Sequence, residues 1–133
     1  MILRLALALC FSGFAFAATA QDVSGRYTVE GRNFDGSRYR GSAEISVTSK
    51  NTCRIRWNTG SVSEGICMRN GSVFAASYGQ KGVAGLVIYE IRPDERMEGL
   101  WTMADRDGVG TETLTPQSRV ARRGSPFGGK MPA

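Results

Sequence analysis

The sequence predicts an all-β protein: a single eight-stranded antiparallel meander, closed or nearly closed into a small up-and-down barrel. Short runs of alternating apolar and polar residues recur between residues 21 and 116, with the period of a strand and not of a helix. Clusters of Gly, Asn, Asp, Ser and Pro separate these runs, and every connection is short. Strands joined by short turns are expected to pair antiparallel with their neighbours in sequence.

The eight predicted strands, in chain order, cover residues 25–32, 38–48, 53–58, 62–69, 72–78, 83–91, 97–104 and 109–115. The turn residues that separate them are, in the same order, 33–37, 49–51, 59–61, Asn70-Gly71, 79–82, 93–95 and 105–108. An open meander leaves two unpaired edges, and closure into a barrel removes them. Glycines within strands suit the bends of a tight barrel, namely Gly41, Gly65, Gly85 and Gly99. A two-sheet sandwich is the alternative architecture.

Cys53 and Cys67 are predicted to form a disulfide. A third hairpin that turns around Gly60 places the two cysteines directly opposite each other, and an exported protein meets an oxidising compartment. The same register sets Arg56 opposite Glu64, a charge-complementary pair.

The Asn70-Gly71 turn then predicts that Cys67 faces Phe74 on the fifth strand. Continuing the alternation assigns the large side chains of one face to the interior. The predicted core residues are Tyr27, Ile55, Trp57, Phe74, Tyr78, Val87, Tyr89 and Trp101.

The opposite face carries an apolar stripe that crosses four strands. Exposed apolar patches of this size often mark partner sites. The predicted partner-binding residues are therefore Ile66, Met68, Val73, Leu86, Ile88 and Leu100. A register error of one residue, which would exchange the two faces, or cover by a neighbouring segment is the alternative interpretation.

The two ends of the chain separate from this body. Residues 1–20 resemble a secretory signal peptide, with a short apolar run and a small-residue cleavage site near Ala20; cleavage after Ala17 is the alternative. The predicted β-barrel domain is 21–116, and 117–133 is predicted to be a flexible basic tail. The protein is therefore expected to be periplasmic or secreted, with no transmembrane segment.

The net charge of +5 is not a property of the predicted domain. Of the 17 basic residues, one lies in 1–20 and four in 117–133, which leaves twelve against twelve acidic residues in 21–116. No nucleic-acid partner is predicted, and at most the tail makes weak, salt-screened contact with anionic surfaces.

Chemistry-bearing motifs are few. The chain has no histidine, and no serine lies in a nucleophile motif, so no catalytic residue, metal site or cofactor is predicted. Glu112 has two interpretations: an inward carboxylate near Trp101 would be a functional candidate, but an outward inter-strand ion pair is favoured.

Several segments together resemble small exported proteins of alphaproteobacteria that are often labelled fibronectin-binding protein. These are Gly25-Arg26-Tyr27-Thr28-Val29-Glu30-Gly31, Asn33, Asp35-Gly36-Ser37 with Tyr39-x-Gly41, Cys53-x-Ile55-x-Trp57, Tyr78-Gly79, Gly99-x-Trp101-Thr102 and Gly110-Thr111-Glu112. The resemblance covers about 25–116 and implies a shared fold and an adhesin-like role, without assigning any contact residue.

The leading functional prediction is an exported, non-enzymatic binding module for a protein or cell-surface macromolecule, which uses the outer apolar face or the loops. An imperfectly closed barrel would also allow strand addition at its edge. The alternative is a periplasmic inhibitor of a hydrolase such as a lysozyme or protease, by analogy of fold. The third prediction is a carrier of a small apolar ligand, for which the aromatic interior is expected to leave too little room.

Overall fold

The computed structural model describes residues 22–117 of the 133-residue chain. The predicted signal peptide and residues 118–133 of the predicted tail lie outside the described residues. The described part forms eight strands: β1 (Gly25–Arg32), β2 (Arg38–Val47), β3 (Thr52–Asn58), β4 (Val62–Asn70), β5 (Val73–Gln80), β6 (Val83–Ile91), β7 (Met97–Met103) and β8 (Arg106–Pro116).

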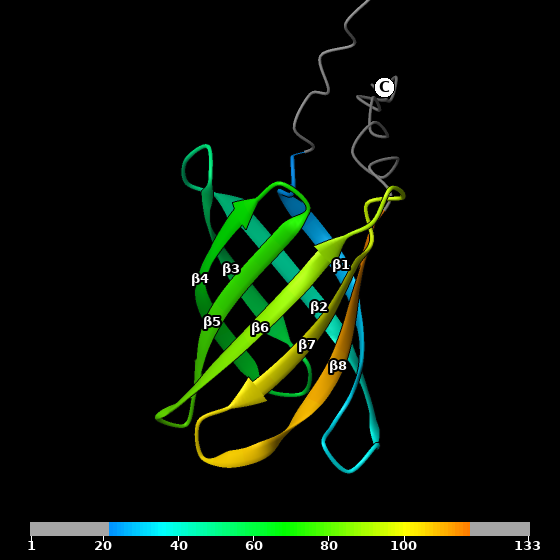
Figure 1. Ribbon diagram of the computed structural model, residues 1–133, viewed down its shortest axis with the longest axis vertical. Coiled ribbons are helices and arrows are strands. Elements are labelled where there is room, and N and C mark those ends of the chain that lie inside the picture. The colour runs from blue at the N-terminus through cyan, green and yellow to red at the C-terminus, as the bar shows by residue number, and fades with distance from the viewer. Residues whose placement is uncertain (1–21, 118–133) are drawn as a thin grey trace, which may run out of the picture.

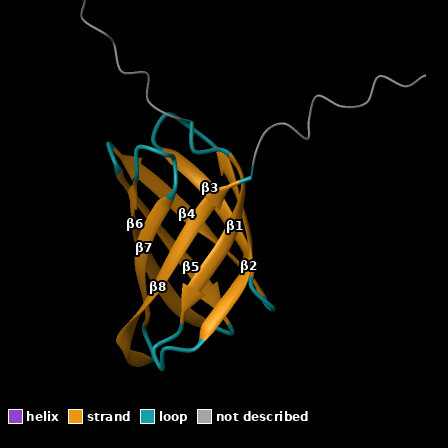
Figure 2. Ribbon diagram, turned by 90° about the vertical axis from the view of Figure 1, so that its right-hand side faces the viewer, coloured by secondary structure: helices purple, strands orange, loops and turns teal. Residues whose placement is uncertain are grey.

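The strands form a closed antiparallel barrel in sequence order (Figures 1 and 2). Closure comes from pairing of β1 with β8, from Tyr27 opposite Pro116 to Arg32 opposite Thr111. The predicted fold class is therefore confirmed, and the sandwich alternative is wrong. Because closure pairs every strand on both sides, the barrel offers no edge for strand addition. No helix in residues 22–117 has the length and hydropathy needed to cross a membrane.

The register between β4 and β5 differs from the predicted one by two residues. Cys67 lies opposite Ala76 and not Phe74, because the turn is made by Gly71 and Ser72 between the paired residues Asn70 and Val73. Gly71 has a φ of 61° while Ser72 does not enter the positive region, as in a type II′ hairpin turn. A two-residue slip keeps every side chain on its predicted face.

The last hairpin also turns earlier than predicted. Met103 pairs with Arg106, so the turn consists of two residues and β8 begins at Arg106, within the predicted connection. The register shifts between Trp101 and Met103, and this irregularity absorbs the difference.

The two ends of the barrel differ in composition. Both ends of the described chain lie at one end, the upper end in Figure 1, which we call the terminal end. The turns β1–β2, β3–β4, β5–β6 and β7–β8 lie at the other end, which we call the mouth. The terminal half of the interior is apolar and includes Val23, Ile45, Phe74, Met97 and Leu114, all buried.

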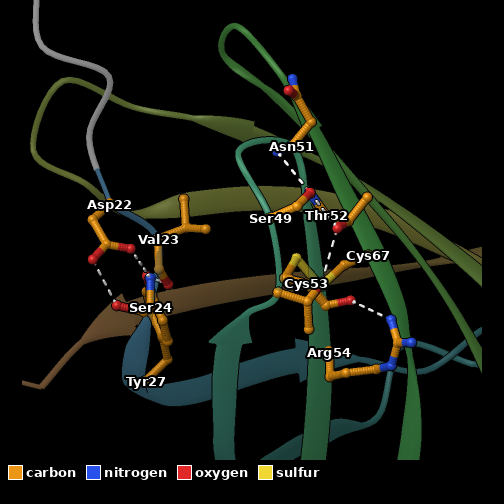
Figure 3. Close-up of a disulfide and its surroundings, with 11 residues drawn as sticks. Asp22, Val23, Ser24, Tyr27, Ser49, Asn51, Thr52, Cys53, Arg54 and Cys67 are labelled. Carbon is orange, nitrogen blue, oxygen red and sulfur yellow. Dashed lines mark hydrogen bonds between the residues drawn. A yellow bond between two sulfur atoms is a disulfide. The ribbon is translucent and has the colours of Figure 1, made fainter.

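The disulfide between Cys53 and Cys67 is confirmed and lies in this apolar half. The two residues are directly opposed, with Cα atoms 4.9 Å apart, and both are buried. Figure 3 shows the disulfide beside the segment that leads into β1, where the hydroxyl of Tyr27 donates a 2.7 Å hydrogen bond to the carbonyl of Val23. The predicted pair Arg56–Glu64 also forms, with Nε and Oε1 3.1 Å apart at the surface.

Toward the mouth, aromatic side chains lie flat on the barrel wall over glycines of the neighbouring strand. A Cβ atom on any of these glycines would collide with the ring that lies directly opposite it. The pairs are Gly31 with Tyr39, Gly85 with Tyr78, Gly99 with Tyr89 and Gly110 with Trp101. Rings placed on the wall in this way leave the lumen partly free, and the covering ring shields a glycine that would otherwise weaken its strand.

This packing predicts that Gly99→Ala destabilises the protein by about 1–3 kcal/mol, as overpacking of a filled site does. The added methyl group would collide with the ring of Tyr89 and lie 2.9 Å from the carbonyl oxygen of Ile88. Gly79→Ala is the matched control, because a Cβ atom at Gly79 has no neighbour within 4 Å. The measurement is the free energy of unfolding in urea, and equal values for the two variants would contradict this packing.

Candidate functional site

The interior near the mouth is organised by a row of five residues across five neighbouring strands. Glu112 on β8 lies between Gly31 on β1 and Gly99 on β7. Beyond each glycine lies a tyrosine, Tyr39 on β2 and Tyr89 on β6. The order across the sheet is therefore Tyr-Gly-Glu-Gly-Tyr. Because neither glycine has a side chain, both tyrosine rings extend over the glycines toward the same carboxyl group.

Both tyrosines donate hydrogen bonds to Glu112. The Tyr39 hydroxyl lies 3.0 Å from Oε1, and the Tyr89 hydroxyl contacts Oε2. Glu112 is 7% exposed, and among the described residues no Lys or Arg forms an ion pair with it. Glu112 is thus a buried acid held by neutral donors.

Burial raises the pKa of the Glu112 carboxyl above its usual range, because removal from water penalises the charged form. The tyrosine hydroxyls and the nearby Trp57 indole oppose this rise without cancelling it. Burial also raises the pKa of Tyr39 and Tyr89, and the Glu112 carboxyl beside them adds to the rise. Burial raises the pKa of Tyr78 to about 12.

The favoured interpretation of Glu112 as an outward ion pair is therefore wrong. The relevant signal was the alternation within β8, where the core residue Leu114 is two positions away. Side chains two apart in a strand share a face, so a buried Leu114 places Glu112 and Gly110 inside. The structure brings Glu112 together with two predicted core residues, Tyr89 and Trp101, in the same half of the barrel.

A cavity of about 260 Å³ lies at the mouth beside this row. Exposed turn residues Asn33 and Ser61 contribute to its lining, so it opens to solvent there. The lining combines rings, small polar side chains, two apolar residues and one carboxyl, namely Asn33, Tyr39, Trp57, Thr59, Ser61, Ser63, Tyr78, Gln80, Val87, Trp101, Met103 and Glu112.

The expectation that the aromatic interior leaves too little room for a ligand is therefore wrong. The predicted core rings Trp57, Tyr78 and Trp101 line the cavity and do not fill it. Two causes are visible in the sequence. Glycines receive the rings on the wall, and small polar residues line the mouth at the β3–β4 hairpin, such as Thr59 and Ser63.

Two hydrogen-bond donors in this lining have no aligned acceptor. Among the described residues, the indole N–H groups of Trp57 and Trp101 are the buried side-chain polar atoms without a hydrogen bond. The Trp57 N–H lies close enough to Glu112 to favour its charged form, but it is not aligned with the carboxyl as a hydrogen bond. The Trp57 N–H also lies near the Tyr89 hydroxyl, and the Trp101 N–H lies near the Tyr39 hydroxyl, so both donors have polar neighbours inside the barrel wall.

The mouth is rimmed by Phe34 and Arg106. The Phe34 ring stacks on Trp101 with centroids 4.7 Å apart, and the Arg106 guanidinium lies 5.7 Å from the Phe34 centroid. Arg106 also pairs with Asp105, with Nε and Oδ1 3.4 Å apart. The cavity lining itself contains no basic residue, and its charge comes from Glu112 alone.

The predicted partner-binding residues lie on the outer surface, away from this cavity. Their exposed fractions range from 43% for Val73 to 59% for Ile66. The predicted neighbours Ile88 and Leu100 are directly opposed. The stripe is therefore present on the surface, and its role in binding a partner stays a prediction.

The remaining predicted core residues lie inside the barrel: Tyr27, Ile55, Phe74 and Val87 are all buried. Within the described residues, no cluster of three or more Cys, Asp or Glu side chains has a geometry that would hold a metal ion. The predicted lack of catalytic activity stays a prediction.

Comparison with known proteins identifies similar folds and does not identify a function. No family model and no curated protein matches the chain. A redesigned β-barrel is similar at 16% identity, with a TM-score of 0.62 over 72% of this chain and 92% of its own. A de novo designed fluorescence-activating β-barrel shares 19% identity, with a TM-score of 0.57 over 71% and 93%. A fatty acid transporter shares 15% identity, with a TM-score of 0.49 over 74% and 98%. At these identities, the similarity shows the fold alone.

The buried acid predicts a pH-dependent stability. The folded-state pKa of Glu112 is raised above its unfolded value, so its contribution is fully present below pH 4.5 and is lost as pH rises through the folded-state pKa. Between the unfolded-state pKa and the folded-state pKa of Glu112, the free energy of unfolding falls by about 1.4 kcal/mol per pH unit. Glu112→Gln cannot ionise, so this pH dependence of the free energy of unfolding is expected to be absent from the variant.

The measurement is urea unfolding of wild type and Glu112→Gln between pH 4 and pH 8. The stability difference between them is expected to shift in favour of Glu112→Gln as pH rises. Glu98→Gln, on the exposed face of β7, is the matched control and is expected to follow wild type. A difference that stays constant, or shifts the other way, would show that Glu112 is not the buried acid described here.

Proposed function

We propose that the protein binds a small organic molecule in the cavity at the mouth of the barrel. The observation that carries this proposal is a solvent-accessible cavity of about 260 Å³ whose wall combines four aromatic rings, small polar side chains and one buried carboxyl. Of the three predictions from the sequence, this corresponds most closely to the ligand carrier.

The lining supports a ligand with a mixed surface. Ring faces and the side chains of Val87 and Met103 offer apolar contact, while Ser63, Gln80 and Glu112 offer polar contacts. Such a combination is typical of specific small-molecule sites, in which a few polar groups fix the orientation of a largely apolar ligand. The cavity is slightly smaller than the roughly 300–1,000 Å³ typical of such sites, so the ligand is small.

The disulfide supports an oxidising compartment as the site of action. Together with the predicted signal peptide, it favours a ligand met in the periplasm or outside the cell. Binding of a macromolecule through the exposed stripe is the second candidate function, and the observation that favours it is the exposure of six large apolar side chains on neighbouring strands. The adhesin-like role implied by the resemblance belongs to this second candidate.

The proposal predicts which half of the molecule ligands contact. Ser63 lies opposite Trp57 and lines the cavity, so Ser63→Leu is expected to reduce its volume and weaken small-molecule binding at least tenfold. Ile88→Ser, on the outer stripe, is the control and is expected to bind as wild type does. The measurement is ligand-observed NMR with a panel of small fragments such as phenol, benzyl alcohol and benzylamine.

Thermal unfolding of both variants establishes that they remain folded. Binding that is lost in Ile88→Ser and retained in Ser63→Leu would assign ligand contact to the outer face and reject the cavity. Absence of fragment binding to folded wild-type protein would reject the proposed function itself.

A further inference from the structure

We infer that the ligand carries a small, positively charged alkylammonium group, which sits among the aromatic rings at the mouth and neutralises Glu112. This inference rests on the proposed function and specifies the class of its ligand. Three independent features of the described residues lead to it: the charge of the lining, the arrangement of its rings and a buried carboxyl without a positively charged partner.

The first feature is the charge of the cavity wall. Glu112 is the one ionisable acid in the lining, and no Lys or Arg lines the cavity. A carboxylate or phosphate ligand would therefore enter a low-dielectric site beside a like-charged group and without a counter-ion. Arg106, at the rim, contacts Asp105 and the Phe34 ring. The wall thus disfavours anions and favours neutral or cationic groups.

The second feature is the arrangement of aromatic rings around the cavity. Four aromatic side chains line it, in two edge-to-face pairs. Trp57 and Tyr78 are 5.4 Å apart with an interplanar angle of 63°, and Tyr39 and Trp101 are 6.2 Å apart at 72°. Rings at steep angles to one another form a box rather than a slot for a flat molecule. Aromatic rings around a site suit alkylammonium groups, because a cation is attracted to the negative face of the ring quadrupole. The faces of Trp101 lie against Gly110 and Phe34, so this contribution falls to the other three rings.

The third feature is the state of Glu112. The tyrosine hydroxyls occupy one acceptor site on each of its oxygens, and a carboxylate offers about four such sites. Burial without a counter-charge favours the protonated form of this carboxyl, and a cation beside it would favour the carboxylate instead. No residue described here provides that counter-charge, whereas an ammonium group in the adjoining cavity would.

The inference is tested with choline and its uncharged isostere 3,3-dimethylbutan-1-ol, which have the same shape and differ in the central atom and its charge. Both tryptophans of the chain, Trp57 and Trp101, line the cavity, so tryptophan emission reports on this site; Trp57 also lines a second pocket, and a change in the emission of Trp101 distinguishes the two. We expect choline to bind the full chain at least tenfold more tightly than the alcohol, with isothermal titration calorimetry confirming the dissociation constants.

Two variants assign the preference to the carboxyl. Glu112→Gln is expected to bring the affinities for choline and the alcohol within about twofold of each other, while the exposed control Glu98→Gln retains the wild-type preference. Arg106→Gln removes the rim cation, and we expect choline binding to be unchanged or tighter. Weaker choline binding in Arg106→Gln would be contrary to the charge argument.

The outcomes separate this inference from the proposed function. If the alcohol binds as tightly as choline or more tightly, or if the choline preference survives in Glu112→Gln, the cation inference is overturned and the small-molecule site stands. If neither compound binds and the fragments above also fail to bind, both are overturned. Thermal unfolding and the far-ultraviolet circular dichroism of each variant show that it is folded.

Discussion

The interaction on which the rest of the structure depends is the pair of hydrogen bonds that two tyrosines donate to the Glu112 carboxyl. It determines which residues are possible on five strands at once, because Gly31 and Gly99 must lack side chains for the rings to cross them. The same arrangement holds the rings of Tyr39 and Tyr89 on the barrel wall. An eight-stranded barrel has an interior just wide enough for side chains to fill, and holding rings on the wall is how this one keeps a cavity.

The two halves of the barrel differ in what they contribute to stability and to the candidate site. The terminal half holds the apolar core, the disulfide and the Tyr27–Val23 hydrogen bond, which together provide stability. This stability offsets the cost of a buried acid and of two unpaired indole donors near the mouth. Buried polar groups that lack ideal partners are uncommon in native structures, and those of this barrel gather in the half that also contains the cavity. The physical contrast between the halves is therefore the main reason to place function inside the barrel, at the mouth.

Much of the fold followed from the sequence because strand periodicity and turn chemistry are local signals. The opposition of Cys53 and Cys67 needed only one hairpin turn at Gly60, and it is confirmed. Turn residues located the hairpins but did not fix their register, so Gly71 was assigned to the wrong position of its turn.

The site was harder to predict because it depends on pairings that are distant in sequence. Glu112 meets Tyr39 across 73 positions, and only barrel closure brings them together. A carboxylate in a strand is usually at the surface, and this general rule predicts the wrong face for Glu112. The alternation with Leu114 predicts the right one. The number of aromatic residues indicates how much ring volume the interior contains, and this alone does not predict a cavity. The position of each ring depends on the glycine opposite it, which lets the ring lie against the wall.

We expect ligands to contact the interior of the mouth and not the outer stripe. This expectation is tested most directly by a ¹H–¹⁵N correlation spectrum of the full chain, in which the two tryptophan indole N–H signals are resolved during titration with choline. We predict that both indole signals shift in a saturable manner, while the backbone amides of Ile88 and Leu100 stay in place. Shifts confined to the amides of the stripe, with both indole signals unmoved, would contradict the account.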